Sequence, residues 1–111
     1  PASCASPRPA PGASERAEER TEDAVAAAAE HHSPVELRVA REKLAEAHKG
    51  KEDRYNPTDK SIYLIEQSEI NSELAIEKSR TAELRARVAE LARQNEILRE
   101  DFEATFGEAV Q

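Results

Sequence analysis

The chain has 111 residues, of which 35% are charged and 4% aromatic, and Ala is its most frequent apolar residue. Because Ala buries little area, this composition excludes a large globular core built by the chain alone. The net charge of −7 argues against general affinity for nucleic acids or anionic membranes, since both require basic surfaces. High Ala, Glu, Arg and Leu content is typical of long helices and coiled coils.

Residues 1–32 are predicted to be a disordered, low-complexity tail rich in Ala, Pro and Glu. The first 13 residues mix Pro, Ala and Ser, a composition that seldom folds. Residues 14–32 turn to Glu, Arg and Ala. They have almost nothing to bury, so we expect a fraying helix there at most.

Residues 33–50 are predicted to form a short helix with a marked start. Ser33 can cap it, Pro34 suits its first position, and Glu36 completes a capping box. A narrow apolar stripe then recurs every three or four residues, at Leu37, Ala40, Leu44 and Ala47. Residues 51–56 are a polar linker.

Residues 57–106 are predicted to form one long helix. Asn56 caps it, Pro57 opens it, and no further Pro or Gly occurs before Gly107. Residues 107–111 are predicted to form a C-terminal tail. The fold class is therefore all-α: a disordered N-terminal tail, a short helix and a coiled-coil helix of about 50 residues.

The long helix carries a leucine-zipper pattern, with its core at residues 84–102. Placing Leu84 at heptad position d puts successive Leu at d, with Val88 and Asn95 at a, which favours a parallel two-stranded coiled coil. Asn95 can pair with its copy across the seam and disfavours other arrangements. The predicted partner-binding residues are Ile70, Leu74, Leu84, Val88, Leu91, Asn95, Leu98 and Phe102.

Two partners fit this pattern: a second copy in a parallel homodimer, or another coiled-coil protein. In a homodimer Glu73 would attract Lys78 of the other copy, whereas Arg80 would repel Arg85. Exposed pairs of this kind contribute only tenths of a kcal/mol, so a heterodimer with a larger acidic partner stays open. A single amphipathic helix lying on a globular partner is the simpler alternative.

A second apolar stripe, Ile62, Ile65 and Ile76, predicts that residues 62–76 contact two neighbours. The short helix could be one of them, folded back with Leu37 and Leu44 as anchors. The sequence does not require this hairpin.

The pattern predicts no enzyme: we find no catalytic residues, no cofactor-binding residues, no metal ligands and no small-molecule substrate. The histidines are not at ligand spacing, and the Glu residues spread around helical faces. The sequence disfavours a basic-leucine-zipper reading of residues 71–80, because residues 60–80 hold three basic and four acidic side chains. The lone Cys4 and the absence of an apolar spanning segment indicate a cytoplasmic protein.

Residues 71–103 are similar to the opening coiled coil of the basal-body-orientation-factor family. The matching positions are Ser79, Arg80, Leu91, Ala92, Arg93, Asn95, Glu96 and Leu98. The resemblance implies a cytoskeletal coiled coil at motile cilia and basal bodies. We therefore predict a structural dimerisation or scaffold protein, with a regulatory heterodimerising subunit or a zipper-type transcription-factor relative as alternatives.

Overall fold

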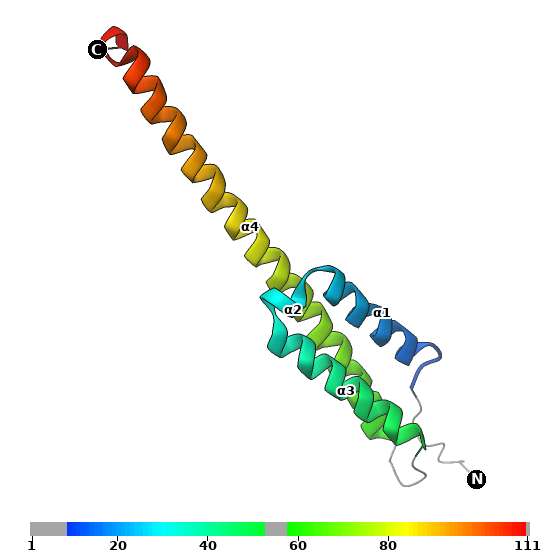
Figure 1. Ribbon diagram of the computed structural model, residues 1–111. Coiled ribbons are helices and arrows are strands. Elements are labelled where there is room, and N and C mark those ends of the chain that lie inside the picture. The colour runs from blue at the N-terminus through cyan, green and yellow to red at the C-terminus, as the bar shows by residue number, and fades with distance from the viewer. Residues whose placement is uncertain (1–8, 53–57, 111) are drawn as a thin grey trace, which may run out of the picture. The chain divides into compact units, whose positions relative to one another are not determined.

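The computed structural model describes residues 9–52 and 58–110, and every regular element in this part of the chain is a helix. The all-α prediction is thus confirmed. The elements are α1 (Ala13–Ala26), α2 (Ala29–His32), α3 (Pro34–Glu52) and α4 (Thr58–Val110), shown in Figure 1. The chain divides into two units, Pro1–Arg80 and Thr81–Gln111, and each is described by itself.

The first unit is a helical bundle formed by α1, α2, α3 and the beginning of α4. One apolar cluster joins the start of α1 to the end of α3 and the start of α4: Ala13, Ala17, Leu44, Ala47, Leu64 and Ile65. A second joins the end of α1 to α2, the start of α3 and a later part of α4: Ala24, Ala29, Leu37, Ala75 and Ile76. Hence α1 runs parallel to α4, and α3 runs antiparallel to both (Figure 1).

A row of small polar side chains lets the three helices approach closely. Ser61, Ser68, Ser72 and Ser79 of α4 are all buried. The Ser68 hydroxyl donates to the Ala40 carbonyl of α3 at 2.9 Å, while the Ser72 hydroxyl lies 3.1 Å from that of Thr21 in α1. Because each of these hydroxyls finds a partner, its burial avoids the cost of an unsatisfied polar group.

The disordered-tail prediction for residues 1–32 is wrong over residues 13–32, which form α1 and α2. Ala17 and Ala24 are fully buried. Alanine buries little area on its own, but it permits close packing against Leu44, Leu64 and Ile65, which supply the apolar volume. Residues 1–8, including Cys4, lie outside the described part of the chain.

The short helix begins at Pro34, as predicted, and ends at Glu52, two residues beyond the predicted limit. It folds back on α4 with Leu37 and Leu44 as anchors, which settles the hairpin that the sequence left open. The predicted capping box gives way to contacts with α4: the Ser33 hydroxyl lies 3.2 Å from that of Ser79, and Glu36 accepts a hydrogen bond from Lys78.

The long helix matches its prediction closely. It spans Thr58–Val110, so the predicted C-terminal tail from residue 107 continues the helix as far as Val110. The predicted cap at Asn56 and Pro57, and most of the predicted linker, fall outside the described residues. The second stripe contacts two neighbours, since Ile65 and Ile76 pack with residues of both α1 and α3.

Candidate interaction surface

The bundle leaves one face of α4 uncovered. Tyr63 and Ile70 are each 55% exposed and Leu74 is 43% exposed, although Leu64, Ile65 and Ile76 on the same helix are buried. The uncovered residues occupy the a and d positions of the zipper heptads, whereas the buried ones follow a different register. The faces of α4 that pack against α1 and α3 therefore differ from the face that carries the a and d positions of the zipper heptads.

The second unit presents the core of the zipper pattern to solvent. Every side chain from Glu83 to Phe106 is exposed. The apolar residues at heptad positions a and d range from 49% exposed at Leu91 to 65% at Val88 and Leu98. We define the zipper face as Leu84, Val88, Leu91, Asn95, Leu98 and Phe102. These residues repeat at spacings of three and four, so they line one side of the helix.

An aromatic pair stands at the end of the zipper face. The ring centroids of Phe102 and Phe106 lie 5.2 Å apart, at a tilted angle of 44°. Both side chains are about half exposed, 52% and 51%. Large aromatic rings in water carry a substantial free-energy gain when a partner covers them. This end of the face therefore exposes two adjacent aromatic rings.

Ion pairs along α4 involve residues outside the seam. Glu90 accepts hydrogen bonds from Arg93 at 2.7 Å and from Gln94 at 2.9 Å. These bonds lower the pKa of the Glu90 carboxyl, the Arg93 bond most, and the pairing raises the pKa of Arg93. Arg99 pairs with Glu96 at 2.6 Å. Pairs at this spacing support the helix without occupying its apolar side.

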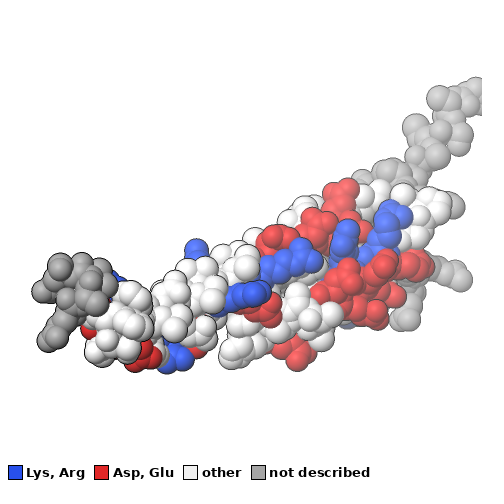
Figure 2. All heavy atoms as spheres, turned by 90° about the horizontal axis from the view of Figure 1, so that it is seen from above, with Lys and Arg blue, Asp and Glu red and all other residues white. Residues whose placement is uncertain are grey.

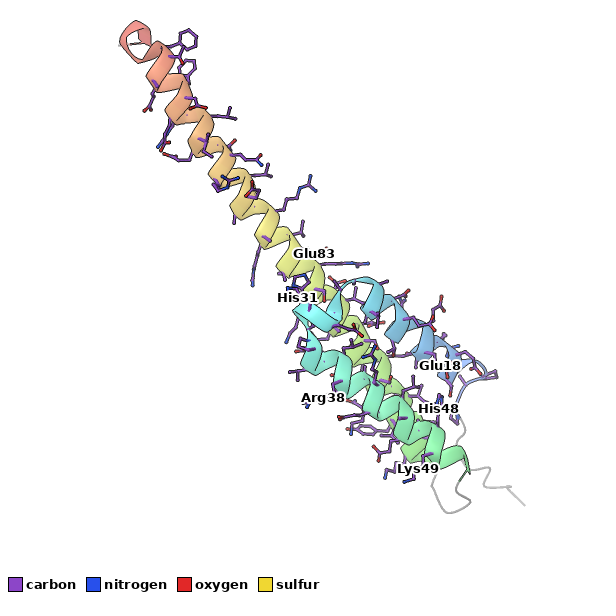
Figure 3. The ribbon with its side chains drawn as sticks, viewed as in Figure 1. Glu18, His31, Arg38, His48, Lys49 and Glu83 are labelled. Atoms are coloured by element: carbon purple, nitrogen blue, oxygen red, sulfur yellow. The ribbon has the colours of Figure 1, made fainter. Side chains whose placement is uncertain are left out.

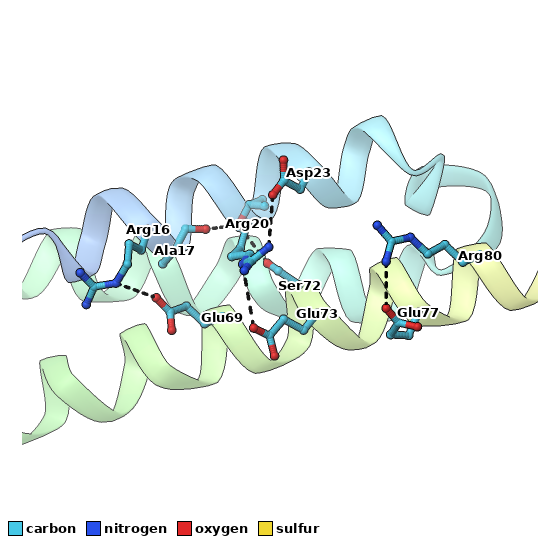
Figure 4. Close-up of polar contacts among 10 residues, drawn as sticks. Arg16, Ala17, Arg20, Asp23, Glu69, Ser72, Glu73, Glu77 and Arg80 are labelled. Carbon is cyan, nitrogen blue, oxygen red and sulfur yellow. Dashed lines mark hydrogen bonds and ion pairs between the residues drawn. The ribbon is translucent and has the colours of Figure 1, made fainter.

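Charged contacts also join the helices of the bundle. Arg16 and Arg20 of α1 each lie 3.9 Å from an acid of α4, Glu69 and Glu73 respectively (Figure 4). Figure 2 shows acidic and basic side chains interleaved over the visible face of the bundle.

Polar side chains also join α1 to α3, and α3 to α4. His48 of α3 and Glu18 of α1 point toward one another at 3.0 Å (Figure 3). Between α3 and α4, the hydrogen bond from Lys78 lowers the pKa of Glu36, with smaller contributions from its own backbone N–H and from the Lys78 charge.

Within residues 9–52 and 58–110, no group of three or more His, Cys, Asp or Glu side chains could hold a metal ion. One hollow of the bundle has Arg16 and Glu69 in its lining, and these two side chains form an ion pair with each other. None of the described helices is both long and apolar enough to cross a membrane.

Sequence reasoning missed the whole contribution of α1 to the bundle. The available signal was the spacing of Ala13, Ala17, Thr21 and Ala24, which places four small residues on one side of a helix. A matching signal in α4 was the run of Ser and Ala at heptad spacing from Ser61 to Ser79. Small polar residues are easily taken for solvated positions, which is why both stripes were overlooked.

One family model matches most of the chain. A family model described as a domain of unknown function, DUF4398, matches residues 13–91. The chain belongs to this family. No curated protein and no solved structure is significantly similar to it.

The DUF4398 match begins at the first residue of α1 and includes both apolar clusters of the bundle. It ends within the zipper face, after Leu91. Asn95, Leu98 and Phe102 therefore lie beyond the match. The bundle is the part of the molecule that the family description covers in full.

Proposed function

We propose that this protein is a non-catalytic association module, in which the bundle is the folded body and the zipper face pairs in parallel with another coiled-coil helix. The observation that carries the proposal is the exposure of all six zipper-face residues at heptad spacing. Burying such a stripe against a second helix recovers roughly 1.5–3 kcal/mol for each large apolar side chain. Structural dimerisation or scaffolding is the function that this surface supports best.

Asn95 supports a parallel orientation. In a parallel, in-register pair, position a faces position a, so the Asn95 amide can hydrogen-bond to a polar group in the same layer. In an antiparallel pair, position a faces position d, which in this chain is Leu throughout residues 84–98. The amide would then be buried without a partner, at a cost of about 1–3 kcal/mol.

Substitution of Leu91 tests pairing through this face. We expect the full chain to self-associate at submillimolar to millimolar concentration, and Leu91→Glu to abolish that association by burying a charge in the seam. The matched control is Ala89→Glu, which adds the same charge two residues away and outside the seam. Light scattering over a concentration series measures the effect. Equal association of Leu91→Glu and wild type would exclude the zipper face as the contact.

Asn95→Val tests the orientation. Removing the amide is expected to strengthen association by about 1–2 kcal/mol and to broaden the distribution of oligomers, because nothing then fixes the register. Sedimentation velocity resolves the species. A variant that associates no more strongly than wild type, with one unchanged oligomeric state, would contradict the proposed pairing of Asn95 with a polar group opposite it.

A cytoplasmic setting in a ciliary or basal-body cytoskeleton stays a prediction that depends on the resemblance of residues 71–103. Fluorescence imaging of a tagged full chain in ciliated cells tests it. Absence of the tag from basal bodies would remove the ciliary part and leave the association proposal intact.

A further inference from the structure

The positions that flank the zipper face are basic or neutral over most of its length. In the zipper register, residues 85, 92 and 99 occupy position e, and residues 87 and 94 occupy position g. They are Arg85, Ala92, Arg99, Arg87 and Gln94, without a single acid. The flank becomes acidic only at Asp101. This pattern stands out in a chain whose net charge is −7.

The acids of the same stretch lie elsewhere on the helix. Glu83, Glu90 and Glu96 occupy positions b and c, away from the seam. Glu90 and Glu96 bind Arg93 and Arg99 along the helix. Within the part of the chain that the structure describes, neither Arg85 nor Arg87 forms an ion pair, so both remain available to an incoming helix.

A second copy of the chain would offer few acidic side chains to the basic residues at positions e and g. In a parallel homodimer Arg80 faces Arg85 of the other copy, and the two-fold symmetry repeats that repulsion. The one attractive pair, Glu73 with Lys78, has competing partners within the chain: Glu73 lies 3.9 Å from Arg20, and Lys78 binds Glu36.

We propose that the preferred partner of the zipper face is a different chain, a parallel coiled-coil helix whose flanking positions are acidic and whose a position opposite Asn95 is polar. This inference depends on the proposed association function and specifies its partner. Glu at the three positions facing Arg85, Arg87 and Arg99 would replace repulsive or neutral contacts with attractive ones. Such complementarity selects partners more than it adds raw affinity.

Three synthetic helices test the partner's chemistry against the full-length protein. All carry this chain's own a and d residues over positions 80–105, which include the g position that faces Arg85. The first has Glu at the three positions that face Arg85, Arg87 and Arg99, the second has Lys there, and the third keeps this chain's own residues. Binding is measured by fluorescence anisotropy. We expect the Glu peptide to bind about tenfold or more tightly than the other two. Each exposed ion pair contributes modestly, but the contributions of three pairs add up. Raising the salt from about 0.05 to about 0.5 M should reduce that preference, because it shortens the screening length.

Charge reversal in the protein supplies the matched control. The double substitution Arg85→Glu and Arg87→Glu should invert the preference in favour of the Lys peptide. Arg93→Glu, the same change at position f on the far side of the helix, should leave the preference for Glu unchanged.

The outcomes separate this inference from the proposed function. Equal binding of the Glu and Lys peptides, or tightest binding of the chain's own sequence, would overturn the acidic partner while leaving helix pairing in place. Failure of all three peptides to bind, with the protein monomeric at every concentration, would overturn both.

Discussion

At the scale of single residues, the bundle combines apolar contacts that need close approach with polar contacts that fix alignment. Ser68 and Ser72 of α4 each take about the volume of Ala, yet their hydroxyls bond to different helices: Ser68 to α3, and Ser72 to α1. A wrong register would leave these hydroxyls buried and unpaired, at about 1–3 kcal/mol each. The Ser residues therefore specify which helix lies where.

The Glu36–Lys78 contact predicts a pH dependence. Because the folded-state pKa of Glu36 is lowered, its ionised form favours folding. That contribution is fully present above the unfolded-state pKa of about 4.3. It is lost as the pH falls through the lower folded-state value. We expect Lys78→Ala to raise the pKa of Glu36, and the stability difference between wild type and variant to shrink below about pH 4.3.

Carbon-13 NMR titration of the Glu36 carboxyl, together with urea unfolding at pH 3 and pH 6, measures both effects. Lys60→Ala, which removes the more exposed Lys60–Glu46 pair at 3.4 Å between the same two helices, is the control and should leave Glu36 unchanged. An identical Glu36 titration in wild type and Lys78→Ala would contradict the assigned cause.

At the scale of helices, α1 depends on the absence of large side chains at its contact face. Ala17 is fully buried between α3 and α4. Ala17→Leu should force the helices apart and destabilise the bundle by about 1–3 kcal/mol. Ala26→Leu, an equal enlargement at an exposed position of the same helix, should change stability by less than about 0.5 kcal/mol. Urea unfolding monitored by circular dichroism compares the two, and equal stabilities would show that α1 does not pack as described.

The helices differ in how well the sequence predicted them. The α4 helix was predictable because its long stretch lacks Pro and Gly and its apolar residues recur in heptads. The α3–α4 hairpin was within reach because Leu37 and Leu44 are large enough to need burial. By contrast, α1 was missed, since its buried face consists of Ala, Ser and Thr, and such a face is stabilised only by partners that a local reading does not include.

The connection between α1 and α3 shows a similar limit. Ala28 has φ of 60°, a left-handed conformation that costs an L-residue about 1–2 kcal/mol. A run of four alanines gives no local indication that the helix breaks there. The break is imposed by packing, because Ala24 and Ala29 must both reach the cluster around Leu37.

At the scale of the whole molecule, the two units should differ in backbone protection. Leu64, Ile65 and Ile76 lie in apolar clusters of the bundle, whereas the zipper face is exposed. In dilute solution we expect amides of residues 84–102 to exchange with solvent faster than those of residues 64–76, because helices without tertiary contacts are marginal.

Hydrogen exchange read by mass spectrometry at two protein concentrations checks this expectation. Protection of residues 84–102 should rise with concentration, or on adding the Glu peptide, while that of residues 64–76 stays constant. The Leu91→Glu variant should show no such rise. Strong, concentration-independent protection of residues 84–102 would mean that this segment is stable without a partner.

The parallel placement of α1 on α4 also has a consequence for synthesis on the ribosome. Thr21 and its partner Ser72 are 51 residues apart, an interval of about 3–10 s at ~5–20 residues per second. During that interval α1 has been synthesised, but its hydrogen-bond partner in α4 has not. The nascent α1 therefore depends on its many Glu and Arg side chains for solubility, and its contacts with the serine row of α4 can form only after α4 has been synthesised.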